Sequence, residues 1–314
     1  MNLFICLTNL HLLIAKAIIE KENLYEVDVI FIGDSENRKN KNYISQISPY
    51  VRNIKIYPNY KNSSSFKTIK RTLYTKKIMA SYEKKYDIVH FANFHIPIIH
   101  HILSLIKFNK IRTFDDGTHN INKMSIMYAK EKIKKHKLFI RNIMGRKYHK
   151  NDILRLIEKH YTIFPGRDNI VENTEYIELI TTIDQHSNKK KKVINILLGT
   201  VYIDAVKEKK RKEELIQRIQ KFIINNNIDF YIPHPRDDKN YFQKINVIDS
   251  EKIAEEEIIS FIKNNYYVNL YGFNTTVQFN LDNVESIKNF SIKSDLFKDS
   301  FNNTLNFNFT TVTI

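Results

Sequence analysis

The chain has 314 residues, 42% of them hydrophobic and 12% aromatic, which is enough to bury one large core or two ordinary ones and excludes an intrinsically disordered protein. Its single cysteine, Cys6, cannot form an internal disulfide, and the N-terminus lacks the features of a cleaved export signal, so we expect a cytoplasmic protein. The formal net charge of +16 is spread evenly, which predicts solvated helix faces and stays compatible with an anionic substrate or lipid surface.

Strand and helix patterns alternate in the first half of the chain. Apolar runs rich in β-branched and aromatic residues predict strands at 2–7, 25–33, 53–58, 86–93 and 110–114. Amphipathic runs predict helices at 10–22, 66–83, 97–107, 123–142 and 151–158. The two most apolar segments, 1–19 and 91–108, are interrupted by polar side chains, so we expect no transmembrane helix.

The polar segment 186–192 predicts a linker, after which the alternation restarts. Strands are expected at 193–199, 228–234 and 267–273, and helices at 203–226 and 254–265. The sequence therefore predicts an α/β protein of two Rossmann-like, doubly wound domains, 1–185 and 193–314, facing a central cleft. We leave the structure of the tail unassigned and consider that, from about residue 290, it packs back on the N-terminal domain.

Residues capable of chemistry follow three of these strands, at the carboxyl ends where doubly wound sheets bind their ligands. They are Asp115 and Asp116 after 110–114, His234 at the end of 228–234, and Thr275 and Thr276 after 267–273. Each segment also has an ordinary structural explanation, as a turn, a strand stop or a helix cap. The glutamates of 254–257 likewise suit a first helical turn. Their joint position favours a shared binding cleft.

Missing motifs exclude several kinds of site. The six glycines form neither a dinucleotide fingerprint nor a phosphate-binding P-loop, and one cysteine without a His-Glu-x-x-His motif argues against a zinc site. A carboxylate on one side of a cleft, with a histidine and hydroxyls on the other, suits group transfer from an activated phosphate ester. Such a reaction needs a base for the acceptor hydroxyl and donors for the leaving phosphate.

Four short segments occur in a fixed order: "ICLTNLHLLIAKAIIEK" at 5–21, "FDDGTHNI" at 114–121, "HPRD" at 234–237 and "YGFNTT" at 271–276. In this order they resemble the motifs of glycosyltransferase family 52, the bacterial lipooligosaccharide and capsule sialyltransferases. The last segment has threonines where that family usually has serines. The resemblance extends from residue 1 to about 280.

The resemblance implies a role for each motif residue. Asp116 would be the general base, supported by Asp115 and Gly117, and His234 would donate a hydrogen bond to the departing phosphate. The implied donor-binding residues are Gly199, Pro235, Arg236, Glu256, Gly272, Thr275 and Thr276. Glu256 is preferred to Glu255 and Glu257 on alignment alone.

The resemblance also implies a GT-B architecture and an inverting, metal-independent transfer of sialic acid from CMP-sialic acid. The expected acceptor is a terminal galactose hydroxyl of a lipooligosaccharide or capsule glycan, in α-2,3 linkage, with no cofactor besides the donor substrate and no nucleic-acid partner. A lipid-linked acceptor suggests peripheral association with the inner face of the cytoplasmic membrane, and a homodimer stays open. The alternatives are a related transferase for another nucleotide sugar and a basic, non-enzymatic binder of glycan or nucleic acid.

Overall fold

The computed structural model describes residues 1–59, 67–131, 135–143, 145–179, 191–237, 240–302, 305 and 307–314. The chain forms two compact units, Met1–Ile180 and Thr181–Ile314. Of the expected linker 186–192, residues 186–190 lie outside the described residues, and Lys192 already belongs to a strand of the second unit.

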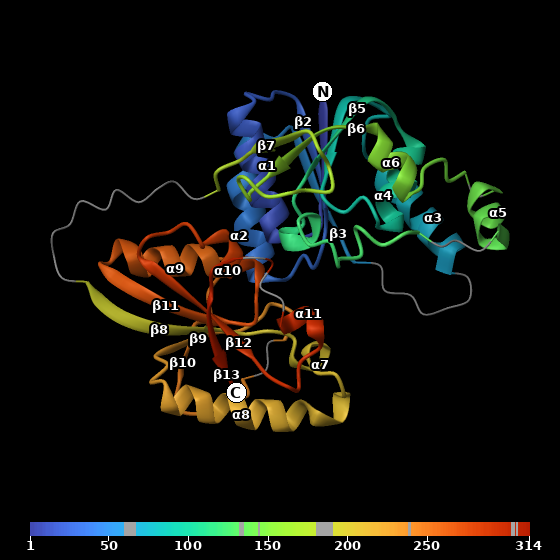
Figure 1. The fold of residues 1–314 in the computed structure, drawn as a ribbon. Coiled ribbons are helices and arrows are strands. Elements are labelled where there is room, and N and C mark those ends of the chain that lie inside the picture. The colour runs from blue at the N-terminus through green and yellow to red at the C-terminus, as the bar shows by residue number, and fades with distance from the viewer. Residues whose placement is uncertain are drawn as a thin grey trace. The chain divides into compact units, whose positions relative to one another are not determined.

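The first unit contains a seven-stranded parallel sheet of order β3-β2-β1-β4-β5-β6-β7. Figure 1 shows α1 and α2 on one face of it, and α3, α4 and α6 on the other. Its elements are β1 Asn2–Cys6, α1 Asn9–Lys21, β2 Val27–Ile32, α2 Arg38–Ile47, η1 Ser48–Tyr50, β3 Asn53–Tyr57, α3 Lys67–Met79, β4 Lys85–Phe91, α4 Pro97–Leu105, β5 Lys107–Phe114, η2 Gly117–Asn120, α5 Lys135–Ile143, α6 Lys150–Leu156, β6 Ile157–Thr162 and β7 Thr174–Tyr176.

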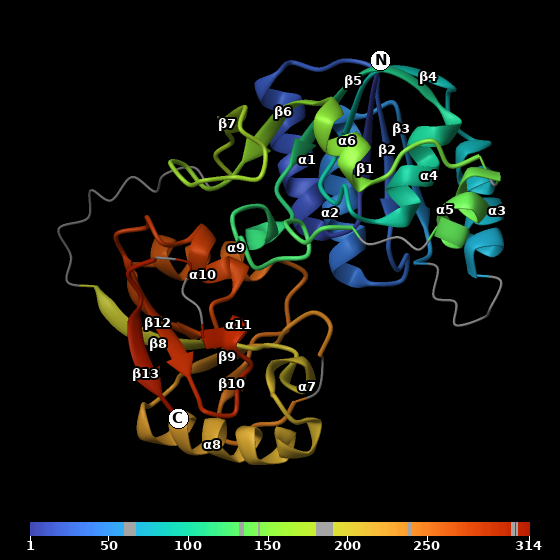
Figure 2. The ribbon, with the colours of Figure 1, turned by 45° about the vertical axis from the view of Figure 1, so that its right-hand side comes forward.

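The second unit contains a six-stranded parallel sheet of order β10-β9-β8-β11-β12-β13. Figures 1 and 2 show α8 on one face of this sheet, and α9 and α10 on the other. Its elements are β8 Lys192–Leu198, α7 Tyr202–Ala205, η3 Lys209–Arg211, α8 Lys212–Asn225, β9 Phe230–Ile232, β10 Asn246–Val247, α9 Ala254–Lys263, β11 Tyr266–Gly272, α10 Thr276–Asn280, β12 Ile287–Lys293, α11 Asp299–Asn302 and β13 Thr310–Thr313.

The two sheets share one topology. In each, the first strand (β1 or β8) lies centrally, the next two extend to one side, and the later strands extend to the other. The expected fold class, α/β with two Rossmann-like, doubly wound domains, is confirmed. The expectation that these domains face a central cleft stays a prediction.

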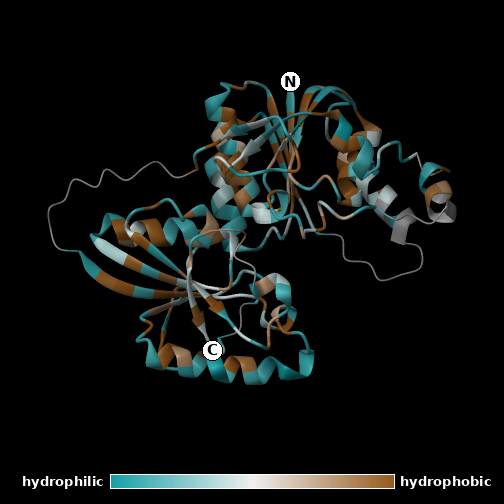
Figure 3. Ribbon diagram, viewed as in Figure 1, coloured by the Kyte–Doolittle hydropathy of each residue, from teal (hydrophilic) through white to brown (hydrophobic). Residues whose placement is uncertain are grey.

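Burial explains the central strands. Every residue of β1 and β2 is buried, as parallel strands covered by helices on both faces require. Figure 3 shows hydrophobic residues concentrated along the strands, and hydrophobic and hydrophilic residues alternating along α8. Helices α1 and α8 therefore pack an apolar stripe against their own sheet while their charged residues stay in solvent.

The tail supplies a strand to the sheet of the second unit, and its expected packing on the N-terminal domain stays a prediction. From about residue 290 it completes β12 and then supplies β13, which pairs in parallel with β12. The tail therefore extends the sheet of the second unit, where the open edge of β12 satisfies its backbone hydrogen bonds.

Two expected long helices are shorter in the structure. Residues 123–131 of the expected helix 123–142 are irregular, and α5 begins only at Lys135. Local bonds explain this, because the Ser125 hydroxyl donates to the His119 carbonyl and accepts from the Met127 amide. The expected helix 203–226 is likewise broken into α7, η3 and α8.

Candidate functional site

In each unit, the strand order reverses next to the first strand, between β1 and β4 and between β8 and β11. Segments that leave the carboxyl ends on either side of such a reversal diverge and leave room for a ligand. In the first unit, Asp116 follows β5, the strand that pairs with β4. Gly199, His234 and Thr275 follow the neighbouring strands β8, β9 and β11 in the second.

Asp115 is fully buried and bonded to the adjoining strand and loop. Its Oδ1 lies 2.8 Å from Nε2 of His160, and its Oδ2 accepts from the Thr162 hydroxyl and the Ile163 amide, each at 2.7 Å. These bonds attach the end of β5 to the end of β6. The carboxylate is fully engaged within the protein, so Asp115 holds the segment from which Asp116 projects.

The Asp116 side chain is 20% exposed. One oxygen, Oδ1, lies 3.1 Å from Nε2 of His11, and the other accepts a short hydrogen bond from the Asn93 side-chain amide. The Asn120 side-chain oxygen accepts from the Asp116 backbone amide at 2.9 Å. The ring of His119 lies 3.8 Å from Oδ2. Segments after β1, β4 and β5 thus converge on one carboxylate.

The electrostatic environment keeps Asp116 ionised. Burial raises the pKa of its carboxyl, but the hydrogen bond with His11 and the nearby imidazoles outweigh burial, and the pKa lies below its ordinary value. Gly117 then turns the chain into η2 with a φ of 54°, in the left-handed region that favours glycine. Asp116 is therefore a partly exposed carboxylate on a tightly defined turn.

In the second unit, Gly199 directly follows β8 at a position where no side chain fits. A Cβ there would lie 2.5 Å from the Tyr231 hydroxyl oxygen and 2.9 Å from the His234 backbone nitrogen. The family resemblance implied that Gly199 is a donor-binding residue, where a missing side chain would let the backbone approach the nucleotide. The approach that the structure shows is to the segment carrying His234.

His234 lies in a turn after β9, followed by the exposed Pro235 and Arg236. The Arg236 backbone amide donates to its Nδ1 at 3.1 Å, which leaves Nε2 as the protonated nitrogen of the neutral ring. Burial lowers the pKa of His234 to about 4, and the nearby Arg236 charge acts in the same direction. At neutral pH this side chain is an uncharged hydrogen-bond donor.

The Thr275 and Thr276 segment begins α10. The Thr275 hydroxyl caps the helix by accepting from the Gln278 amide at 3.4 Å, and the Gln278 side chain accepts from the Thr275 amide at 3.3 Å. Gly272 makes room for that glutamine, because a Cβ on Gly272 would lie 2.6 Å from Gln278 Oε1. The capping interpretation of these threonines is thus correct for Thr275, whose hydroxyl proton stays free to donate.

The three glutamates of α9 have different environments. Glu255 is buried, accepts from the Asn280 amide at 2.9 Å, and has its pKa raised by burial. Glu257 accepts a short hydrogen bond from the Ser250 hydroxyl. Glu256, preferred from the sequence, is half-buried.

Sequence reasoning missed His11 and Asn93 as neighbours of Asp116. A usable signal existed, since both follow the strands β1 and β4 on either side of the reversal in strand order. That signal required the order of the strands, which an alternating pattern does not provide. Within the described ranges, no group of three or more His, Cys, Asp or Glu residues could hold a metal ion.

Among the residues that the structure describes, none of the helices combines the length and apolar character needed to cross a bilayer.

Comparisons with known proteins show the family. The model of glycosyltransferase family 52 matches residues 25–296. The chain is 32% identical to the CMP-N-acetylneuraminate:beta-galactoside alpha-2,3-sialyltransferase of Pasteurella multocida, over 91% of this chain and 90% of the relative. It is 29% identical to the N-acetyllactosaminide alpha-2,3-sialyltransferase of Haemophilus influenzae, over 90% and 88%. Among solved structures, MurG of Acinetobacter baumannii aligns with a TM-score of 0.46 and 12% identity, covering 99% of this chain and 85% of its own.

Proposed function

This chain belongs to glycosyltransferase family 52, and we propose that it is a sialyltransferase that moves sialic acid from CMP-sialic acid to a galactoside hydroxyl in α-2,3 linkage. The names of two relatives, which specify a galactoside or N-acetyllactosaminide acceptor and this linkage, support the substrate class. The observation that carries the chemistry is Asp116, an ionised and partly exposed carboxylate at the ligand-binding edge of its sheet.

The proposed reaction is a single displacement. The acceptor oxygen forms a bond to the anomeric carbon of sialic acid as the bond from that carbon to the phosphate oxygen breaks, and CMP leaves with the electron pair. The acceptor proton passes to Asp116. A carboxylate of lowered pKa is too weak a base to ionise a sugar hydroxyl beforehand, so proton transfer accompanies bond formation, when the hydroxyl becomes acidic. Attack from the side opposite CMP inverts the anomeric centre.

His234 and the threonines serve the leaving group in this proposal. As a neutral imidazole, His234 donates its Nε2 proton in a hydrogen bond to the phosphate of CMP. The hydroxyl groups of Thr275 and Thr276 donate hydrogen bonds to the same phosphate. Glu256 binds the ribose. The roles of Pro235, Arg236, Gly199 and Gly272 are to shape this donor site.

A metal ion is unnecessary in the proposed mechanism. A monophosphate leaving group carries less charge than a diphosphate, so one imidazole and a few hydroxyl donors can stabilise its departure. We further propose that the acceptor is the terminal galactose of a bacterial surface glycan, lipooligosaccharide or capsule. The reaction then takes place in the cytoplasm, at the inner face of the membrane.

The test is transfer from CMP-sialic acid to lactose in the presence of EDTA, with CMP release followed in parallel. We expect sialyllactose to form, and to form from no other nucleotide sugar at a comparable rate. Asp87→Asn is a suitable control for the loss of the Asp116 carboxylate, because Asp87 belongs to the same unit but lies near the amino end of β4, with its side chain 61% exposed. Transfer from a different nucleotide sugar, with none from CMP-sialic acid, would show that the donor assignment is wrong.

A further inference from the structure

We propose that His11 is a positioning residue that holds the Asp116 carboxylate in the orientation needed to receive the acceptor proton. This inference rests on the proposed function, because it assigns a task to His11 within that reaction.

The location of His11 supports this role. It lies in the first turn of α1, where the Thr8 hydroxyl caps the helix by accepting from the His11 backbone amide at 3.2 Å. Its side chain is fully buried, with the ring edge-on to Phe114 at 5.5 Å between centroids. The imidazole is therefore confined between the start of α1 and the end of β5, directly before Asp115 and Asp116 in the chain.

The hydrogen bonds of the ring fix its tautomer. The Leu7 backbone amide donates to Nδ1 at 3.1 Å, so Nδ1 carries no proton in the neutral ring. The proton is then on Nε2, which lies 3.1 Å from Asp116 Oδ1 and donates to it. Backbone geometry after β1 thereby orients a donor toward the carboxylate.

Together, His11 and Asn93 hold both carboxylate oxygens. His11 donates to Oδ1 and the Asn93 amide donates to Oδ2, while Asn120 accepts from the Asp116 backbone. Two donors from two different segments fix the plane of the carboxylate. The remaining lone pairs are available to an acceptor hydroxyl on the exposed side.

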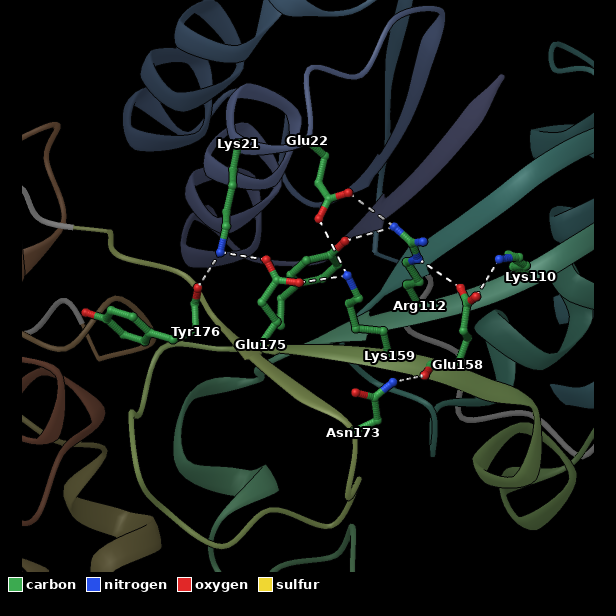
Figure 4. Close-up of polar contacts among 10 residues, drawn as sticks. Lys21, Glu22, Lys110, Arg112, Glu158, Lys159, Asn173, Glu175 and Tyr176 are labelled. Carbon is green, nitrogen blue, oxygen red and sulfur yellow. Dashed lines mark hydrogen bonds and ion pairs between the residues drawn. The ribbon is translucent and has the colours of Figure 1, made fainter.

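The helix that carries His11 is itself attached to the strands beside Asp116. Figure 4 shows the last turn of α1 joined to β5, β6 and β7 by charged side chains. Glu22 pairs with Arg112 of β5 at 3.5 Å and with Lys159 of β6 at 3.7 Å. Lys21 pairs with Glu175 of β7 at 2.6 Å. Helix α1 is thus held at both ends relative to β5.

His11 acts through Asp116 and not as a second base. Its Nδ1 is occupied by the Leu7 amide and its Nε2 already carries a proton, so it has no free lone pair for the acceptor proton. The proton therefore stays on Asp116 until solvent removes it.

Removing the His11 donor should raise the pKa of the Asp116 carboxyl. The groups that face this carboxylate are His11 from α1, Asn93 and His95 from the segment after β4, and His119 from η2. Burial alone would raise the pKa of Asp116. Without the His11 hydrogen bond, the acid limb of the activity profile should move to higher pH.

Two substitutions separate the two hydrogen bonds of the ring. In His11→Gln, the amide nitrogen can take the place of Nε2 and keep the donor to Asp116. In His11→Asn, the amide oxygen can take the place of Nδ1 and keep the bond from Leu7, but nothing reaches Asp116. We expect His11→Gln to retain most transfer activity. We expect His11→Asn to lose about 10- to 100-fold in kcat/KM for the acceptor, with its acid limb shifted upward.

His90→Leu is the matched control. His90 is a fully buried imidazole of β4 that stacks on Phe4, and its ring nitrogens have no hydrogen-bond partner within the described residues. Losing this imidazole should leave the acid limb unchanged. Equal losses in His11→Gln and His11→Asn, with an unshifted acid limb, would overturn the proposal, and a loss confined to His11→Gln would instead assign His11 a structural role through Leu7.

A spectroscopic readout separates failure of this inference from failure of the proposed function. Nitrogen-15 NMR of labelled histidine should show the Nε2-protonated tautomer for His11, assigned by the signal lost in His11→Gln. Carbon-13 titration of the Asp116 carboxyl, assigned with Asp116→Asn, should shift upward in His11→Asn only. If the wild type transfers no sialic acid, the proposed function fails while the carboxyl titration still decides the role of His11. An unmoved titration would contradict the inference whatever the activity.

Discussion

Asp115 and Asp116 are adjacent in the chain, yet their carboxylates have opposite environments: that of Asp115 is fully buried against His160, and that of Asp116 is 20% exposed beside His11. The pair divides two tasks that a single residue could not perform. A carboxylate whose oxygens are occupied by Thr162, Ile163 and His160 secures the turn, which leaves its neighbour available to a substrate.

The first prediction concerns the stability role of Asp115. Asp115→Ala should lower the free energy of unfolding by about 3 to 5 kcal/mol, because it leaves buried donors on β6 and the following loop without their partner. Chemical denaturation of the purified variant measures this. Asp116→Ala should cost clearly less, and equal losses in the two variants would contradict the division of tasks.

The second prediction concerns the protonation state of His234. Because burial lowers its pKa to about 4, the ring is neutral above about pH 5, and kcat/KM for CMP-sialic acid should show no loss from this group between pH 5 and pH 8. His234→Gln, which can keep a donor at the position of Nε2, should retain more activity than His234→Asn. An activity that falls steadily as the pH rises above 4 would instead identify His234 as an acid that must be protonated.

The third prediction concerns the close approach at Gly199. In Gly199→Ala the added methyl group would press on the Tyr231 hydroxyl and on the His234 backbone, so unfolding should become about 1 to 3 kcal/mol easier and CMP should bind more weakly. Adding Tyr231→Phe removes the hydroxyl but not the backbone contact. Calorimetric titration with CMP should therefore show weak binding in the double variant too. If the double variant bound CMP as tightly as the wild type, the added methyl group would not have displaced His234.

The fourth prediction concerns stability in acid. Burial lowers the pKa of His90 to about 3, so below pH 6.5 the unfolded chain binds a proton at this position that the folded chain does not. Above pH 6.5 this group does not lower the free energy of unfolding, and its destabilising effect grows as the pH falls toward 3. Between pH 6.5 and pH 4, the wild type should lose about 3 kcal/mol of unfolding free energy through this group, and His90→Leu should not show that loss. Urea denaturation at a series of pH values measures it, and identical slopes in both proteins would disprove it.

Much of the fold could be predicted from the sequence because the central strands are continuous apolar runs. Strands β1, β2, β4, β8 and β11 all appear close to their expected places. The short edge strands β7 and β10 could not be predicted, since three and two residues carry no usable pattern. Helix α2 was also missed, because its polar sequence buries only Tyr43 and Ile47.

The candidate site was only partly visible for a related reason. Asp115, Asp116 and His234 stand next to strands that the sequence marks clearly, and the Asp-Asp-Gly and His-Pro segments single them out. His11 carries no such mark, since it looks like one polar residue within an apolar helix. Its significance comes from the packing of α1 against β5, a contact between residues 105 positions apart in the chain.

The central claim is tested most directly by measuring sialic acid transfer from CMP-sialic acid to lactose, with EDTA present, in the wild type and in Asp116→Ala and His234→Ala. The account predicts transfer that survives EDTA and falls at least about a hundredfold in each variant, as the loss of a group acting in the transition state should produce. Slow release of CMP without transfer to lactose would retain the donor and reject this acceptor. A wild type that neither transfers sialic acid, hydrolyses the donor nor binds CMP would contradict the account.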